Sequence, residues 1–584
     1  MTENMPPIDV VPQDHNTPIL SIAKQLFFGR IDPAITPYPR PSLEEKERTD
    51  LFCHKLRQFC EAHIDPQEID RESKIPANVI EGLGKLGLLG MTIPQNYGGL
   101  GMSLTAYCKA LEVVSQRCGS TSAFLTAHQS IGFKALLLFG TPEQKEKWLP
   151  RIATGEIVAS FALTEPNVGS DANAVETFAE YDAAKNVFYI TGKKQWITNG
   201  SFAKIFTVMA KTDVDTGQGV KQRVTAFIVT PDMPGFKITT PALDKFGIRG
   251  VQSTSLEFDR MEVPAENILG KIGEGLKVAL TVLNYGRITI GAGCAGPAKI
   301  LVDHTFKYAR ERHQFNQPLS NFGLVKNKLS TLAALAYAID AVTYFTAGKV
   351  DHGQKDFMLE AAIVKVFSTE ALWKMIFETM QIFGGKAMFN DKPYQLLMRD
   401  CRPGMIVEGS NEVMNLFISM NGIKEVGVHL KQMLQSTKSF WESKDQVREN
   451  WKYLFNLFWP SNLELYSPSL QKEAKSLTQT TAFLGKSVLK LLWRYGDLLV
   501  QKQQDLERIS LAAIHIYVTA AVLSKMDSDL ERAHDKIDLI GCDLETTKFF
   551  CRYSLKKARQ ILKDLFDPLD QVSESLADHL IADL

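Results

Sequence analysis

The sequence has no excess of charge of either sign, because 66 lysines and arginines are balanced by 66 aspartates and glutamates. Proteins that bind nucleic acids present a surplus of basic side chains, so nothing here indicates a nucleic-acid partner. Cysteines are also few, and the eight present form no C-x-x-C pair and no cluster with histidine. This spacing argues against a zinc site or a disulfide framework and favours a reducing compartment, either the cytoplasm or the mitochondrial matrix.

Long apolar runs are missing too. No run reaches the ~18 residues needed to span a bilayer, and the longest, 511–523, is predicted to be a buried helix. Residues 1–19 are acidic and contain prolines, and they lack both the apolar centre of a signal peptide and the arginine-rich pattern of a transit peptide. We therefore expect neither a signal peptide nor a transmembrane helix.

The glycine-rich signatures of two common nucleotide-binding sites are absent. No G-x-G-x-x-G follows a predicted strand, and no G-x-x-x-x-G-K-[ST] occurs. The sequence therefore excludes a Rossmann dinucleotide site and a P-loop. A nucleotide cofactor, if this chain binds one, must be held in another way.

Size and periodicity divide the chain into five segments. A chain of 584 residues is too long for one hydrophobic core, and its 45% hydrophobic and 23% charged residues are typical of a globular protein. Helical periodicity is interrupted by a strand-like region, which predicts a mainly α fold with a central β domain of barrel or sandwich type. The expected segments are an N-terminal extension at 1–44, a helical domain at 45–158, the β domain at 159–274, a four-helix bundle at 275–429 and a helical extension at 430–584.

Short β-branched and aromatic runs predict the strands, and apolar residues at three- and four-residue spacing predict the helices of the bundle. The predicted strands are 187–191, 205–210, 224–229 and 256–263. The predicted bundle helices are 277–293, 300–314, 322–348, 357–383 and 413–422.

A single carboxylate, Glu408, follows three apolar residues and precedes Gly409. Burial disfavours the ionised form of a carboxyl group and raises its pKa, so a shielded glutamate is a stronger base than a solvated one. Gly409 allows a substrate to approach the backbone closely. This stretch predicts a base at the wall of a closed pocket. The alternative is an ordinary helix start, with Ser410 or Asn411 as cap and Glu412 in the first turn.

Two polar segments of the β region could face a planar ring and phosphate oxygens. The first, 161–171, combines hydroxyls, a glycine and a proline in an extended stretch. The second, 194–200, places Trp196 near a threonine and ends in a turn-forming Asn-Gly, so the indole could stack on a ring. The alternatives are a proline-glycine turn for the first segment and a hairpin with Trp196 in the core for the second.

Several motifs occur together in one order and spacing: Thr164-Glu-Pro with Gly169-Ser170-Asp171, Trp196-Ile-Thr-Asn-Gly, Arg312-His-Gln314-Phe315, Gln381-Ile-Phe-Gly384-Gly385 and Glu408-Gly409-Ser410. Across residues 45–425 this pattern resembles the acyl-CoA dehydrogenase family. The chain length, the helical extension and the segments 127–134 and 284–287 make the sequence most similar to the very-long-chain members of that family.

The resemblance implies an FAD-dependent enzyme that introduces a trans-2,3 double bond into a fatty acyl-CoA, with Glu408 as the base that removes the α-proton. It implies cofactor contacts by Phe161, Leu163, Thr164, Gly169, Ser170, Trp196, Ile197 and Thr198, and by Ser410, Asn411 and Glu412. A second subunit is implied to hold the far end of FAD through Arg312, Gln314, Phe315, Gln381, Gly384 and Gly385, so we expect at least a homodimer. Substrate contacts are implied for Ser170, Asn284, Tyr285, Arg287, Val407 and Gly409.

Some relatives carry the base immediately before the arginine that corresponds to Arg287. Here this neighbour is Gly286, preceded by Tyr285, and neither can act as a base, which leaves Glu408 as the matched candidate. For two of these cations there is an alternative to a binding role. Arg287 could be a charge on the surface of a helix, and Arg312 could be a surface helix cation.

The sequence departs from the family pattern at two places near these motifs. Ser410 stands where the family mostly has threonine, and the hydroxyl is retained. Asn316 stands where glycine is usual, which puts the local turn in doubt and leaves the chemistry unaffected.

The helical extension is associated with membrane attachment in the very-long-chain members. An aromatic cluster at 451–459 is the predicted membrane contact, because aromatic side chains favour the membrane interface. A contact between domains is the alternative for this cluster.

The resemblance implies an electron-transfer flavoprotein as acceptor. An acyl-CoA oxidase, which passes electrons to oxygen, is the alternative enzyme, and a non-catalytic scaffold for respiratory-complex assembly is the alternative of another class. The intact Glu408 and the full set of flavin motifs argue against a scaffold as the only role, whereas the oxidase stays open until peroxide formation is measured. The small residues at 120–123 could leave room for a long acyl tail.

Overall fold

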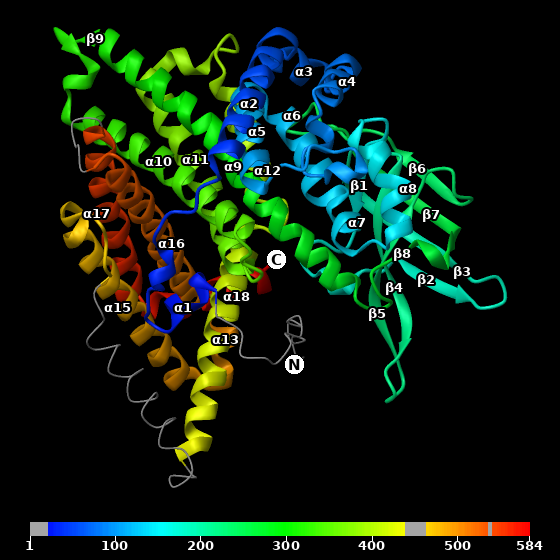
Figure 1. The fold of residues 1–584 in the computed structure, drawn as a ribbon. Coiled ribbons are helices and arrows are strands. Elements are labelled where there is room, and N and C mark those ends of the chain that lie inside the picture. The colour runs from blue at the N-terminus through cyan, green and yellow to red at the C-terminus, as the bar shows by residue number, and fades with distance from the viewer. Residues whose placement is uncertain (1–20, 438–462, 535–539) are drawn as a thin grey trace.

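A computed structural model of the chain describes residues 21–437, 463–534 and 540–584. In this part of the chain a β domain lies beside a group of N-terminal helices and a long helical bundle, and further helices follow the bundle (Figure 1). The predicted fold, mainly α with a central β domain, is confirmed.

Three of the N-terminal helices, α1, α2 and α5, begin at serines whose side chains accept hydrogen bonds from backbone N–H groups of the first turn. Ser42 accepts from Glu45 at the start of α2, and Ser103 accepts from Ala106 at the start of α5. The helices are α1 (Ile22–Phe27), α2 (Leu43–His63), α3 (Pro66–Glu72), α4 (Ala77–Lys85), α5 (Leu104–Arg117), α6 (Gly119–Leu125), α7 (Lys134–Phe139) and α8 (Pro142–Ala153), with a π-helical turn (Thr126–Gly132) before α7.

The β domain is a single sheet in the order β6-β7-β3-β2-β4-β5-β8, with β1 pairing in parallel to β4. Its strands are β1 (Ala159–Ala162), β2 (Phe178–Asp182), β3 (Val187–Thr198), β4 (Ile205–Asp215), β5 (Val220–Val229), β6 (Phe236–Thr240), β7 (Ser253–Pro264) and β8 (Ile268–Leu269). Phe206, Phe227 and Phe258 fill its core and are fully buried. All four predicted strand runs lie within this sheet and are confirmed.

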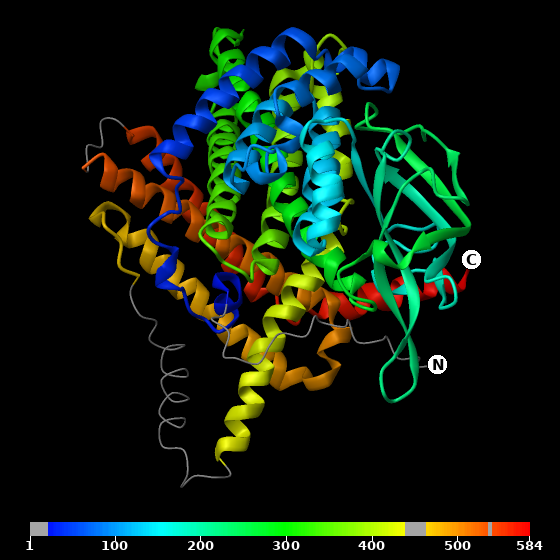
Figure 2. The ribbon, with the colours of Figure 1, turned by 45° about the vertical axis from the view of Figure 1, so that its right-hand side comes forward.

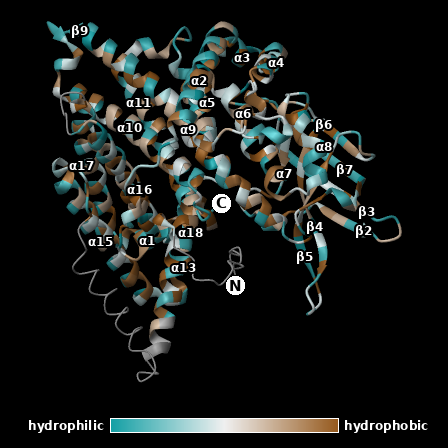
Figure 3. Ribbon diagram, viewed as in Figure 1, coloured by the Kyte–Doolittle hydropathy of each residue, from teal (hydrophilic) through white to brown (hydrophobic). Residues whose placement is uncertain are grey.

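The bundle consists of α9 (Gly275–Glu311), α10 (Gly323–Asp351), α11 (Met358–Phe383) and α13 (Asn411–Thr437), with the short α12 (Tyr394–Gly404) before α13. Figure 3 shows apolar and polar residues mixed along these helices, as amphipathic packing requires.

The expected break near Pro297 is absent, so the prediction of two separate helices is wrong and α9 runs through it. A proline inside a helix costs ~3 kcal/mol. Here the helix persists because Pro297 is buried and α9 packs against α5, α10 and α11. After α9, β9 (His313–Gln314) and β10 (Gln317–Pro318) form a small hairpin.

Four described helices follow the bundle: α15 (Gln471–Tyr495), α16 (Gln503–Arg532), α17 (Gly541–Lys563) and α18 (Pro568–Ala582). By length and composition α10 and α16 could each cross a membrane, but 78% and 83% of their most apolar windows are buried inside the protein. The predicted burial of the 511–523 helix is thereby confirmed. By contrast, α18 has no buried residue, and it extends from these helices toward the β domain (Figure 2).

A network of buried charges joins α16 to the bundle. Lys525 of α16 and Lys299 of α9 each lie 2.6 Å from an oxygen of Asp340 on α10, and Lys299 also lies 2.6 Å from Glu112 of α5. Burial alone would raise the pKa of Asp340, but Lys525, Lys109 and Lys299 hold it well below its usual range. The C-terminal helices are therefore fixed to the bundle by ion pairs as well as by apolar packing.

Candidate functional site

A cavity of about 2230 Å³ lies where the β domain, α9 and the loop between α12 and α13 meet, and it extends along α13 to the start of α16. Most of the residues predicted to bind cofactor or substrate line it: Phe161, Leu163, Thr164, Gly169, Ser170, Trp196, Ile197, Thr198, Arg287, Val407, Glu408, Gly409 and Ser410. Residues far apart in the sequence thus line one cavity.

Two direct hydrogen bonds bring the two polar segments of the β domain together. The backbone N–H of Gln195 donates to the carbonyl of Thr164 at 2.9 Å, and the hydroxyl of Ser160 donates to the carbonyl of Thr198 at 2.6 Å. The segment predicted as a proline-glycine turn does turn at 165–168, where Glu165 and Val168 pair. The turn therefore forms part of the cavity wall.

A buried ion pair supports this wall from behind. Lys194 lies 2.6 Å from Glu165, and neither side chain is exposed to solvent. Lys194 also donates to the carbonyl of Leu163, and Glu165 accepts from the N–H of Thr177. Burial lowers the pKa of Lys194 to about 8, and Glu165 opposes this change. Since each charge has several partners, the pair holds the backbone of the wall in one position.

Trp196 lies at a bulge in β3, where the pairing with β7 shifts register between Lys194 and Ile197. Its backbone is left-handed, with φ of 60°, and its side chain is 60% exposed and faces the cavity. The alternative of a hairpin with Trp196 in the core is therefore wrong. A bulge turns a side chain away from its expected face, and alternation along the strand does not predict it.

The hydroxyls of Thr164, Ser170 and Thr198 line the cavity near this indole, and none hydrogen-bonds to another described residue. An exposed indole with unpaired hydroxyls suits a planar ring that carries hydrogen-bonding heteroatoms. This wall therefore fits an isoalloxazine ring.

Glu408 lies in the loop between α12 and α13, with φ of 56°, and Gly409 follows with φ of 93°. A side chain at Gly409 would be strained by this φ and would meet the methyl group of Met414 at 2.6 Å. The carboxylate of Glu408 packs against α9, because a Cβ at Gly286 would lie 2.3 Å from its Oε2. This oxygen is shielded from solvent and has no hydrogen-bond partner among the described residues.

The charge of Glu408 is costly in this position. Burial raises its pKa to about 7, and the cations of Arg287 and Lys365 limit the rise. The guanidinium of Arg287 donates to the carbonyl of Glu408 at 3.3 Å and to the amide oxygen of Asn284 at 3.0 Å. Arg287 is buried, so the alternative of a helix-surface charge is wrong. The site therefore combines a basic carboxylate with a buried cation that holds its backbone.

The helix-start alternative is correct for the residues that follow. The N–H of Val413 donates to the hydroxyl of Ser410, and Glu412 lies exposed in the first turn of α13. Asn411 is buried and points into the bundle. Asn411 and Glu412 therefore do not line the cavity, although Val413 and Met414 of α13 do.

Two predicted substrate residues also lie behind the wall. Asn284 is buried and supports Arg287. Tyr285 packs edge-on against Phe357, and the ammonium of Lys134 lies over its ring. Neither lines the cavity.

The residues assigned to a second subunit do not line this cavity. Arg312 ends α9 and is exposed, and Phe315 at the tip of the β9–β10 hairpin is 87% exposed. Figure 1 shows β9 at the end of the molecule opposite to the β domain. The structure therefore does not bring these residues together with Glu408 within one chain.

The hairpin turn forms with asparagine in place of the family's glycine. Asn316 adopts φ of 62°, a conformation that asparagine tolerates better than most residues. Gln381, Gly384 and Gly385 lie at the end of α11, where a Cβ on either glycine would meet only open space. Gln381, Gly384 and Gly385 are therefore exposed at the surface. Arg312 is exposed too, as expected for a surface cation at the end of a helix.

Two residues of the site were missed by the sequence analysis. Gly286 has no local signal of its contact with Glu408, since 122 positions separate the two. Lys365 interrupts the apolar run 361–367 of α11, and a cation in such a run signals a buried, paired charge. The predicted aromatic cluster at 451–459 lies outside the described residues.

Sequence profiles of known families match about four fifths of the chain. Those of the acyl-CoA dehydrogenase N-terminal, middle and C-terminal domains match residues 46–156, 160–261 and 273–423. The profile of the ACAD9/ACADV C-terminal domain matches residues 468–579.

Individual relatives extend this similarity. The chain is 34% identical to the mitochondrial very long-chain specific acyl-CoA dehydrogenase of Rattus norvegicus, over 88% of this chain and 80% of the rat protein. It is 33% identical to the probable acyl-CoA dehydrogenase FadE10 of Mycobacterium tuberculosis, over 96% and 88% of the two chains. The crystal structure of an acyl-CoA dehydrogenase complexed with FAD from Bacillus anthracis matches with a TM-score of 0.78 and 26% identity, over 92% and 91%.

The raised pKa of Glu408 predicts a pH-dependent cost in stability. Its folded pKa of about 7 exceeds the ~4.3 of an unfolded chain, so the folded state keeps a proton that the unfolded state loses between these values. The stability contribution of Glu408 is therefore full below pH 4 and is lost as the pH rises through 7. Glu408→Gln should be more stable than the wild type by about 2 kcal/mol at pH 8, and no more stable at pH 4.

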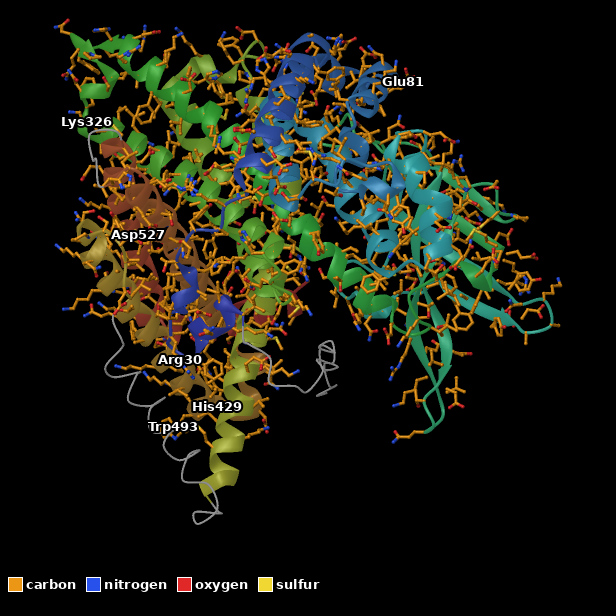
Figure 4. The ribbon with its side chains drawn as sticks, viewed as in Figure 1. Arg30, Glu81, Lys326, His429, Trp493 and Asp527 are labelled. Carbon is orange, nitrogen blue, oxygen red and sulfur yellow. The ribbon has the colours of Figure 1, made fainter. Side chains whose placement is uncertain are left out.

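Urea unfolding at the two pH values measures this difference. The expected gain is smaller than the full shift implies, because one edge of the carboxylate faces the cavity. Glu81→Gln, on the exposed surface of α4 (Figure 4), should leave the free energy of unfolding unchanged at both pH values. An equal gain from Glu408→Gln at pH 4 and pH 8 would contradict the assigned pKa.

Proposed function

This chain belongs to the acyl-CoA dehydrogenase family of FAD-dependent oxidoreductases, and we propose that it converts long or very long chain fatty acyl-CoA to trans-2-enoyl-CoA with Glu408 as the base. The observation that carries the proposal is the shielded carboxylate of Glu408 on the cavity wall, with its raised pKa and its backbone held by Arg287. A carboxylate of ordinary pKa would be too weak a base for the α-proton of a thioester.

Glu408 begins the reaction by taking the α-proton on its carboxylate, which becomes neutral. The cavity excludes most of the water that would otherwise stabilise the carboxylate, so it is more basic in this position. The backbone N–H of Glu408 has no partner among the described residues and can donate to the thioester oxygen as enolate charge develops. The loss of one such donor typically costs ~3–4 kcal/mol of transition-state stabilisation.

The β-domain wall holds the cofactor in this proposal. Trp196 would stack on the flavin ring, and Thr164, Ser170 and Thr198 would hydrogen-bond to its heteroatoms, as their unpaired hydroxyls permit. When bound, FAD supplies the oxidant that accepts the β-hydrogen with its electron pair.

The size of the cavity supports a long acyl chain. Its volume of about 2230 Å³ exceeds the ~300–1,000 Å³ of ordinary ligand sites. Ser122 and Ala123, two of the small residues predicted to leave room for a tail, line it together with Gly119 and Cys294. We assign the acyl tail to this part of the cavity, between α6 and α9.

The proposed base can be tested directly in the flavin-loaded protein. Glu408→Gln should keep its yellow flavin and lose roughly 10³-fold or more in turnover, the upper range for a general base. The measurement is anaerobic bleaching of the flavin by acyl-CoAs from short to very long chains, which should be fastest in the wild type with the long chains. Glu81→Gln serves as the matched control.

Three outcomes would contradict this proposal. Near-normal turnover in Glu408→Gln would refute the assignment of Glu408 as the base. Bleaching that is fastest with short-chain acyl-CoAs would refute the assigned chain length. We assign electron transfer to an electron-transfer flavoprotein, so stoichiometric peroxide during aerobic turnover would instead identify an oxidase.

A shared site is part of the proposal, because Arg312 and Phe315 do not line the cavity and the β9 strand between them lies at the end of the molecule opposite to the β domain (Figure 1). The Glu408→Gln variant should be inactive because it lacks the base. The double variant Arg312→Glu/Phe315→Asp should be inactive because it does not hold the cofactor. Mixed dimers of the two variants should regain activity, because one of their two sites combines an intact Glu408 with an intact partner hairpin. Co-expression with two affinity tags isolates the mixed dimers, and their inactivity would refute the shared site.

Peripheral membrane contact through the C-terminal extension is also proposed. Trp493 at the end of α15 (Figure 4) is 88% exposed and Leu498 is 60% exposed, and Arg494 follows Trp493 in the sequence. Exposed aromatic and cationic side chains favour a bilayer interface. Replacing Trp493 and Leu498 with serine should weaken flotation with anionic liposomes, and unchanged flotation would refute this contact.

A further inference from the structure

The loop that carries Glu408 is held by a cation from the neighbouring helix. The ammonium of Lys365, on α11, donates to the backbone carbonyls of Met405 at 3.2 Å and Gly409 at 2.7 Å, and to the amide oxygen of Asn411 at 2.7 Å. These three acceptors use all three donors of a lysine. Two of them flank Glu408 on either side, so one buried group spans the loop.

The orientation of this cation is fixed by further contacts. Lys365 is fully buried. The amide nitrogen of Asn411 donates to Thr369 at 3.1 Å and to Glu370 at 2.7 Å, which turns the amide oxygen toward Lys365. These hydrogen bonds therefore fix the amide oxygen of Asn411 as an acceptor for the ammonium of Lys365.

The loop needs such support because its backbone is unfavourable. Glu408 and Gly409 both have positive φ, at 56° and 93°, and a non-glycine residue in this region typically costs ~1 kcal/mol or more. Arg287 binds the carbonyl of Glu408, and Lys365 binds the carbonyls of Met405 and Gly409. Three carbonyls within five consecutive residues are therefore bound by cations. This conformation places the carboxylate against Gly286.

We infer that Lys365 is a positioning residue for proton abstraction: it aims the Glu408 carboxylate by binding the loop carbonyls, and its charge favours the carboxylate form. The inference rests on the proposed role of Glu408. The direction of the electrostatic effect is consistent with it, because burial raises the pKa of Glu408 while Arg287 and Lys365 lower it.

The charged surroundings of the pair are few. Arg287 from α9 and Lys365 from α11 face Glu408, and Arg287 and Glu370 of α11 also act on Lys365, while burial keeps the nearby thiol of Cys294 neutral. Burial lowers the pKa of Lys365 to about 8, and Glu408 opposes this change. Lys365 is therefore protonated at neutral pH, where Glu408 titrates.

The test replaces Lys365 in the flavin-loaded enzyme. K365M removes the charge and the three donors at similar side-chain length. We expect kcat to fall about 10- to 100-fold, as for a misplaced catalytic group, with KM nearly unchanged. We also expect the acid limb of the kcat/KM profile to move upward by about one pH unit, the lower end of the effect of a neighbouring opposite charge. K365R, which keeps the charge, should restore the acid limb.

Proton removal is measured separately from flavin reduction. A 3-thiaacyl-CoA labelled with deuterium at the α-carbon has no β-hydrogen to transfer, so loss of deuterium to solvent reports the base alone. K365M should slow this exchange by the same factor as kcat. K374M is the matched control, because Lys374 lies on the same helix and its ammonium hydrogen-bonds to Tyr553 and to no other described residue.

Each outcome decides the inference. An unmoved acid limb in K365M overturns it, whether activity is normal or reduced, because a merely structural role would lower activity and flavin content without moving the limb. If K365M is recovered without flavin, K365Q, which lacks the charge but keeps donors, carries the same pH test. Retained turnover in Glu408→Gln would instead refute Glu408 as the base. The two experiments therefore distinguish failure of the proposed function from failure of the inference about Lys365.

Discussion

The structure depends on keeping one carboxylate where water cannot stabilise its charge. Burial raises the pKa of Glu408 to about 7, so the site retains a group whose ionisation costs folding energy. The surrounding helices limit this cost without removing it. Arg287 from α9 binds the loop backbone at Glu408, and Lys365 from α11 binds it on both sides, while Oε2 stays unpaired. Had a cation paired directly with the carboxylate, the base would be weaker.

The arrangement of the domains follows from what the cavity must hold. The β domain supplies a wall of unpaired hydroxyls and an exposed indole, and the bundle supplies the charged groups on the opposite side. The ion pair of Lys194 and Glu165 keeps the first wall rigid. On the proposed function, a planar ring and a thioester fit between the two walls, and the small residues near α6 leave space for an acyl tail.

Local sequence patterns predicted the fold class and all four strand runs, because strands are determined largely by neighbouring residues. The resemblance to a family supplied the predicted site residues, and part of them line the cavity. Contacts between distant segments were not predictable in this way. The packing of Glu408 against Gly286, the continuity of α9 through Pro297 and the bulge that exposes Trp196 all arise from tertiary packing. Lys365 left a partial signal, a cation within an apolar helix, but its acceptors lie some 40 positions later.

The contact between Gly286 and Glu408 also constrains how this sequence can evolve. A side chain at 286 would meet the carboxylate of Glu408, which would have to move to make room for it. On the proposed function, loss of the acid at 408 would leave the protein without a base, and a change at 286 would move that base from its position. A lineage that transfers the acid from the loop before α13 to α9 would then lose activity on the way unless both positions changed together.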